Sequence, residues 1–122
     1  MQPSEIWRRG IVLPHSAEVA ERIAASDVDE SVPVDFLPID DDLQFNQLWD
    51  IKLFSEINDA CGTLIEDYES EWLLPEHFPA AIPVVRRLHS KNSNGPIGHF
   101  MRRLSDMIDR ASRARMPLYF EL

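Results

Sequence analysis

The stretch "DDLQFNQLWDIKLFSEINDACGTLIEDY", Asp41 to Tyr68, carries the strongest helical periodicity of the chain. Its apolar residues recur at steps of three and four, which places them on one face of an α-helix. This stripe consists of Leu48, Ile51, Phe54, Ile57, Cys61, Leu64, Ile65 and Tyr68. Asp40 to Asp42 offer an N-cap and acids that suit the helix dipole. The pattern predicts a helix that begins near Asp41, bends or packs closely at Gly62, and is stopped by Pro75.

The N-terminal third predicts a strand, a helix and a loop. Residues Glu5 to Leu13 resemble a short strand that ends at Pro14. Ser16 is a suitable N-cap for a helix over residues 17–26, whose apolar residues share one face. The following segment combines acids with two prolines, and it reads as a loop with at most a short edge strand, Val34 to Leu37.

The C-terminal third predicts two further helices and a strand. The first helix covers about Pro79 to His89, with Pro83 at a position where it could distort the helix. The second begins near Pro96, and its buried stripe is Ile97, Met101, Leu104, Ile108 and Ala111. The ending "MPLYFEL" has strand-like residues that could pair with the N-terminal strand. We therefore expect one α+β domain over residues 1–122, mainly helical, with four to five helices and a small sheet from the terminal strands.

Length and composition indicate a soluble intracellular domain. A chain of 122 residues can enclose a single hydrophobic core. One cysteine, Cys61, excludes an internal disulfide and fits a reducing cytosol. The N-terminus lacks the pattern of a signal peptide, and no apolar run approaches the roughly 20 residues that span a membrane. A cytoplasmic location without membrane contact follows as an expectation.

The charge is distributed very unevenly. Fifteen acids and one base, Lys52, lie between Asp27 and Glu76, whereas eight bases and two acids lie between Arg86 and Arg115. The acidic block repels nucleic-acid phosphate and favours a basic partner. The basic segment could bind phosphate, or it could pack beside the acidic block and neutralise it.

The densest acidic cluster is Glu66, Asp67, Glu69 and Glu71. On a helix, Glu66 and Glu69 would lie on neighbouring turns, and Asp106 and Asp109 repeat that spacing on the last predicted helix. Two facing pairs could hold magnesium and act on phosphate esters. This arrangement faintly resembles the all-α nucleotide pyrophosphatases of the MazG type, but the second pair is two aspartates and the separation is long. The alternative is a solvated helix face without a metal.

Other catalytic patterns are weak. The histidines form no pair at metal-ligand spacing, and glycine is too sparse for a phosphate-binding loop. Cys61 lies on the apolar stripe and reads as a core residue, although a Cys61–His89 dyad stays open. We therefore predict no catalytic residue, no metal and no cofactor.

Two tryptophans lie beside acids, Trp49 next to Asp50 and Trp72 after the acidic cluster. An aromatic anchor ringed by charge suits a protein-docking surface. The alternative is that both rings belong to the core at the edge of a helix.

The segments "ACGTLIEDYESEWLLPEHFPAAIPVVRRL" and "MPLYFEL" give the chain, over about residues 54–122, a resemblance to a family. It resembles small acidic bacterial immunity proteins that are encoded beside secreted or contact-dependent toxins. The resemblance implies a scaffold that binds and neutralises a cognate protein toxin, and it transfers no toxin-binding residue.

An immunity protein needs a surface that complements its toxin, which is often basic. The acidic block meets this requirement. The predicted partner-binding residues are Asp40, Asp41, Asp42, Glu66, Asp67, Tyr68, Glu69, Glu71 and Trp72. The alternatives are the metal-dependent nucleotide hydrolase and an acidic adaptor that either is regulatory or mimics DNA. The sequence leaves open which toxin is bound and in which oligomeric state.

Overall fold

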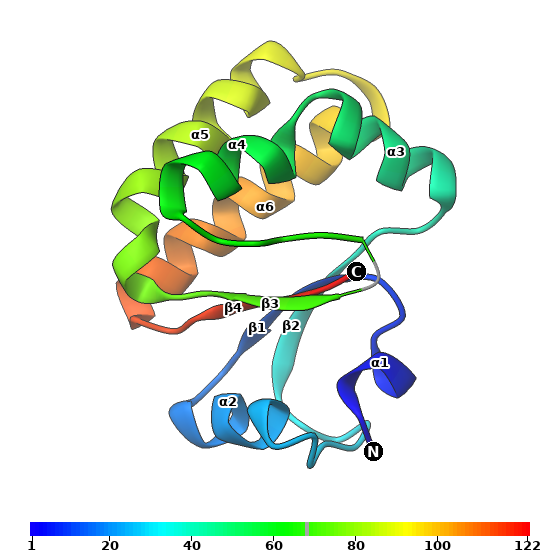
Figure 1. The fold of residues 1–122 in the computed structure, drawn as a ribbon, viewed down its shortest axis with the longest axis vertical. Coiled ribbons are helices and arrows are strands. Elements are labelled where there is room, and N and C mark those ends of the chain that lie inside the picture. Colours follow the sequence, from blue (N-terminus) through cyan, green and yellow to red (C-terminus); the bar gives the residue numbers. More distant parts are fainter. Residues whose placement is uncertain (68) are drawn as a thin grey trace.

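A computed structural model describes residues 1–67 and 69–122. Within these residues, a four-stranded antiparallel sheet lies between two unequal helical layers (Figure 1). Its strands are β1 (Gly10–Pro14), β2 (Val34–Pro38), β3 (Ser70–Leu73) and β4 (Leu118–Glu121), in the order β2-β1-β4-β3. The first and last strands of the chain therefore pair at the centre of the sheet, as the sequence predicts, and β2 is the expected edge strand.

The helices divide between the two faces of the sheet. The larger layer holds α3 (Asp42–Asp50), α4 (Leu53–Cys61), α5 (Phe78–Lys91) and α6 (Gly95–Ala114), with a short 3₁₀ turn, η1 (Pro75–His77), before α5. The smaller layer holds α1 (Pro3–Ile6) and α2 (Ala17–Ala24). The fold is thus α+β and mainly helical, as predicted, and the described residues form six α-helices where four to five are expected.

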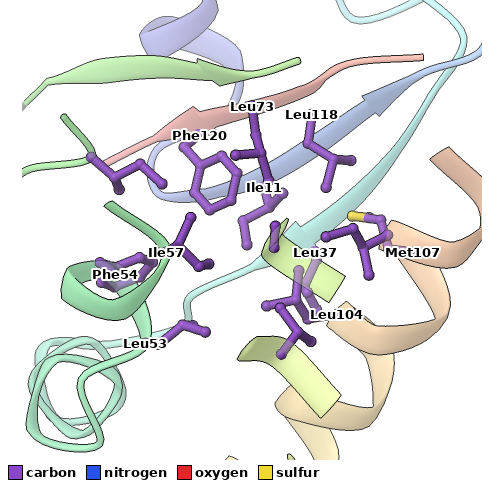
Figure 2. Packing of buried hydrophobic residues seen from close by; sticks show 14 of the residues in the cluster. Ile11, Leu37, Leu53, Phe54, Ile57, Leu73, Leu104, Met107, Leu118 and Phe120 are labelled. Atoms are coloured by element: carbon purple, nitrogen blue, oxygen red, sulfur yellow. The ribbon is translucent and has the colours of Figure 1, made fainter. Parts of the chain in front are cut away.

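The main core lies between the sheet and the larger layer (Figure 2). Ile11, Leu37 and Phe120 of the sheet pack with α4 and α6, and the rings of Phe54 and Phe120 meet edge to face at 6.4 Å and 85°. Side chains alternate along a strand, so the neighbours Val12 and Tyr119 point to the other face. There they pack with Trp7 and the apolar side of α2. Both faces of the central strands are therefore buried.

The apolar stripe that begins at Leu48 is divided between two helices, so the single predicted helix is wrong. Residue Lys52, between α3 and α4, has a left-handed backbone conformation with φ of 67°. The second helix ends at Cys61, and Gly62 follows it with φ of 69°, a conformation that glycine adopts without steric cost. Beyond this point Ile65 is fully buried while Leu64 is 68% exposed, so the helical stripe does not continue.

One side chain, Asn58 of α4, holds the chain after Gly62 in a loop. Its Oδ1 accepts hydrogen bonds from Ile65 N and Thr63 Oγ1, both at 2.8 Å, and its Nδ2 donates to the Ile65 carbonyl at 2.9 Å. These bonds satisfy backbone groups that a continued helix would pair internally. The capping glycine and this asparagine together replace the predicted helix with a loop over residues 62–67.

Two further elements differ from the predictions. Residues 70–73 form β3, where the sequence predicts helix, and their alternation puts Leu73 into the main core and Trp72 on the opposite face. Residues 3–6 form α1, so the first strand begins only at Gly10. By contrast, Ser16 caps α2 as predicted, accepting a hydrogen bond from Val19 N at 3.2 Å, and α5 runs through Pro83.

We predict that Asn58→Ala lowers the free energy of unfolding by about 2–3 kcal/mol, because three hydrogen bonds to a partly buried loop are lost. Urea unfolding measures this loss. The matched control is Asn46→Ala on the exposed side of α3, which should change stability by about 0.5 kcal/mol or less. Equal effects of the two variants would show that Asn58 does not hold the loop.

Candidate partner-binding surface

The sheet topology brings both acidic runs of the sequence to one end of the sheet. At this end β1 and β3 begin while β2 and β4 finish, with Gly10 opposite both Pro38 and Glu121, and Ser70 opposite Glu121. The charged residues that flank these four strand ends therefore come close together. We call this surface the acidic end, and it comprises Arg8, Arg9, Asp40, Asp41, Asp42, Glu66, Asp67, Glu69 and Glu121.

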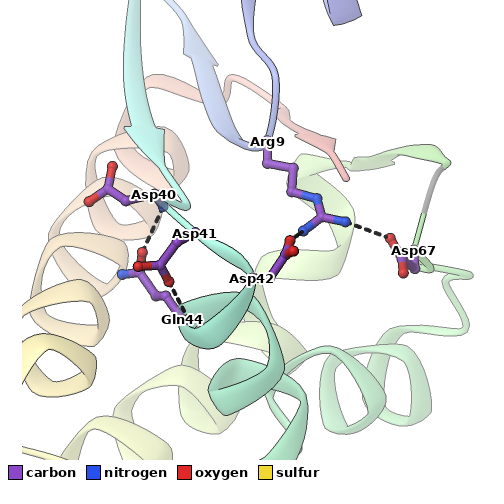
Figure 3. Close-up of polar contacts among 6 residues, drawn as sticks. All are labelled: Arg9, Asp40, Asp41, Asp42, Gln44 and Asp67. Atoms are coloured by element: carbon purple, nitrogen blue, oxygen red, sulfur yellow. Dashed lines mark hydrogen bonds and ion pairs between the residues drawn. The ribbon is translucent and has the colours of Figure 1, made fainter.

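Arg9 links the two acidic runs (Figure 3). Its Nη1 donates to Asp42 Oδ1 at 2.8 Å and its Nη2 donates to Asp67 Oδ1 at 3.3 Å. The guanidinium carbon also lies 4.1 Å from the centre of the Phe45 ring, which adds a cation–π contact. One half-buried cation thus fixes two carboxylates that are 25 positions apart in the sequence.

Two hydrogen bonds hold the start of α3, and Gln44 takes part in both. Asp41 is the N-cap, as predicted, and its Oδ1 accepts from Gln44 N at 2.8 Å. Gln44 Oε1 in turn accepts from Asp40 N at 2.8 Å. The carboxylates of Asp40 and Glu66 are exposed and make no hydrogen bond or ion pair within residues 1–67 and 69–122. These two acids are therefore available to a partner.

The other predicted residues differ in position and exposure. Glu66 and Glu69 do not share a helix, because both lie in the segment between α4 and β3. Glu71 is half-buried in β3, and Trp72 packs against Tyr119 with ring centres 4.8 Å apart. Tyr68 lies outside the described residues. Through Arg9 the structure thus brings Asp67 to Asp42, which follows Asp40 and Asp41 in the chain. Trp72 instead packs with the apolar cluster of Trp7, Val12 and Tyr119 on the other face of the sheet.

Trp49, the other tryptophan considered for docking, packs against the main core. Its ring centre lies 5.0 Å from that of Phe54 and 6.4 Å from that of Phe45. The indole nitrogen is buried and has no partner among the residues that the structure describes. The position favours the core alternative over a docking anchor.

Tyr119 and Glu121 form a buried polar pair that is not predicted from the sequence. Tyr119 donates its hydroxyl to Glu121 Oε2 at 3.2 Å, and only 8% of Glu121 is exposed. Burial raises the pKa of Glu121 and raises that of Tyr119 to about 12. The alternation in "LYFEL" is the signal that places both side chains on one face of β4, away from Phe120 in the main core.

The four acids of the metal-site alternative do not converge. Asp109 accepts a hydrogen bond from Arg86 of α5 at 3.3 Å. Asp106 lines a hollow beside β2, together with Arg103 and Arg110. In the part of the chain that the structure describes, no group of three or more His, Cys, Asp or Glu side chains could hold a metal ion.

The basic segment neutralises part of the acidic block inside the fold. Arg87 donates to Glu56 at 2.6 Å, and Arg110 pairs with Asp35 of β2, which also contacts His15 at 3.0 Å. These contacts hold down the pKa of Asp35. Neither partner acid belongs to the acidic end, so the negative charge there is not offset by these pairs.

No protein-family model, curated protein or solved structure matches this chain. Among the helices of the described residues, none is long and apolar enough to cross a membrane.

We predict that Arg9→Ala lowers the free energy of unfolding by about 1–2 kcal/mol, because two ion pairs and a cation–π contact are lost. Arg9→Lys keeps the charge but not the planar fork, so its loss should be intermediate. The control is Arg102→Ala, an exposed residue of α6 without an ion pair in the described part of the chain. If thermal unfolding shows the same stability for Arg9→Ala and Arg102→Ala, the bridge contributes nothing.

We also predict a pH effect at Glu121. Its raised pKa means that the folded protein holds this proton more tightly than the unfolded chain does. The resulting stability is full below the ordinary pKa of 4.5 and is lost as pH rises through the folded-state pKa. Glu121→Gln cannot ionise and should therefore lose this part of the pH dependence, and it should be more stable than the parent at neutral pH. Denaturant unfolding between pH 4 and 8 measures the difference in stability between Glu121→Gln and the parent. A difference that is the same at every pH would contradict the prediction.

Proposed function

We propose that this chain is an immunity-type protein that neutralises a cognate protein toxin by binding it through the acidic end. The observation that carries the proposal is the convergence of the two acidic runs around Arg9. Apart from the buried Glu121, the acidic end combines six acids with two bases, and one of those bases is already engaged by two of the acids. A surface of this charge attracts a basic partner and accelerates its encounter.

Hydrogen bonds order the Asp40 to Asp42 side of the acidic end, which favours tight binding. The cap at Asp41 fixes the first turn of α3, and Ile39 N donates to the Arg9 carbonyl at 3.1 Å beside it. Surfaces that are ordered before they bind lose little conformational entropy on association. A cytoplasmic scaffold of this kind needs no catalytic group, only a stable complementary face.

The proposal predicts that the double variant Asp40→Lys with Glu66→Lys binds the toxin at least about tenfold more weakly, because two free carboxylates become cations that repel a basic surface. Isothermal titration with the product of the adjacent toxin gene measures the affinity. The variant should keep its thermal stability, because neither carboxylate has a partner among the described residues.

The matched control is Glu18→Lys with Glu21→Lys on α2, which follows the opposite end of β1. This variant makes the same change in net charge and should bind the toxin as the parent does. Equal weakening by both double variants would mean that net charge alone matters. Unchanged affinity of the Asp40 and Glu66 variant would remove the acidic end from the interface.

A further inference from the structure

A polar pocket of about 400 Å³ opens beside the acidic end, on the face of the sheet that carries α1. The ends of β3 and β4 contribute Ser70, Tyr119 and Glu121, and the N-terminal segment contributes Arg8. The other polar residues of the lining are Gln2, Ser4, Ser26 and Glu69. The volume falls in the range of roughly 300–1,000 Å³ that is typical of ligand sites.

Glu121 gives this pocket its chemical character. Its carboxyl group is buried, and the Tyr119 hydroxyl at 3.2 Å is its one hydrogen-bond donor within residues 1–67 and 69–122. No ion pair joins it to a cation of the described residues. A buried carboxylate without a counter-charge is costly, and a cation that enters the pocket would offset part of that cost.

The lining selects a ligand with several hydrogen-bond donors. Glu121 and Glu69 supply carboxylate oxygens, and the hydroxyl groups of Ser26, Ser70 and Tyr119 supply further acceptors. Two acids against Arg8 leave a net negative charge, which disfavours an anion. A guanidinium group has five N–H donors in a planar fork, and it can pair with a carboxylate through two hydrogen bonds.

We propose that this pocket receives the guanidinium group of an arginine side chain of the partner protein, with Glu121 as its buried counter-ion. The inference rests on the proposed function, since it names a group of the basic partner that the acidic end attracts. The exposed acids Asp40 and Glu66 steer the partner, and the pocket anchors one of its side chains. Buried arginine contacts of this kind dominate the energy of many protein interfaces.

Arg8 of the chain itself competes with the guanidinium group of a partner for Glu121. It lines the same pocket, is exposed, and has no ion pair in the described part of the chain. Removing it leaves two carboxylates and no cationic side chain among the residues that line the pocket. Arg8→Ala should therefore strengthen binding of an arginine probe by about two- to fivefold.

The direct test uses acetyl-arginine-amide as the probe, with acetyl-citrulline-amide as its neutral analogue of nearly the same shape. Two-dimensional NMR of the ¹⁵N-labelled chain follows the titration. The arginine probe should shift the backbone amides of Ser70, Tyr119 and Glu121, and the citrulline analogue should shift them at least tenfold less at equal concentration. Equal shifts from the two probes, or shifts confined to Asp40 and Glu66, would overturn the proposal.

The decisive variant is Glu121→Gln, which keeps the size of the side chain and can still accept from Tyr119. It should weaken binding of the arginine probe at least tenfold. Tyr119→Phe keeps the carboxylate and should weaken binding of the arginine probe less than Glu121→Gln does. Because both variants alter the same hydrogen-bonded pair, this comparison separates loss of the carboxylate from an effect on folding. Binding that is unchanged in Glu121→Gln, or equal binding of acetyl-lysine-amide, would show that the pocket is not a guanidinium site.

The same variants separate this inference from the proposed function. If Glu121→Gln captures the toxin as well as the parent does while the Asp40 and Glu66 variant fails, the pocket proposal is wrong and the toxin-binding proposal stands. If the arginine probe binds through Glu121 but the chain captures no toxin, the guanidinium site stands without the immunity function.

Discussion

The pairing of β1 with β4 is the constraint on which the rest of the structure depends. These strands are the first and last of the chain, they lie at the centre of the sheet, and every residue in both is buried. Each strand packs one face against the larger helical layer and the other against α2 and Trp7. Because both faces are covered, charged residues gather where the strands end.

The antiparallel order then decides which charged residues meet. The segments before β1 and β3 and after β2 and β4 all emerge at one end of the sheet, so residues distant in sequence become neighbours there. Arg9 pairs with both Asp42 and Asp67 at this end, and its positive charge reduces the repulsion between the two acidic runs. Glu121 is the exception to the exclusion of charge, since it lies buried in β4 at the rim of a pocket. A cation from a binding partner would offset part of the energetic cost of that position.

Much of the fold could be predicted from local patterns. The stripe of α6, the Ser16 cap, the edge strand near Val34 and the pairing of the terminal strands all follow from periodicity and capping chemistry. The segment after Cys61 could not, because its conformation depends on the side chain of Asn58 reaching seven residues along the chain. The acids before and within β3 also make the alternation of its buried and exposed side chains difficult to recognise in the sequence.

The candidate site was predictable in composition but not in geometry. The sequence identifies Asp40 to Asp42 and Glu66 to Asp67 as acidic, yet only the sheet order and Arg9 bring them together. It also leaves Trp72 open as an anchor, whereas the structure packs this ring on Tyr119. Glu121 escapes detection, because a single acid in an apolar C-terminal strand shows its burial only in the folded sheet.

The most direct test of the central claim, that the acidic end is the partner-binding surface, is hydrogen–deuterium exchange of the chain with and without its cognate toxin. Binding should slow exchange over residues 8–10, 39–45, 64–67 and 69–70 and leave α2 unchanged. Protection of α2 or of the basic side of α6, with the acidic end unaffected, would contradict it.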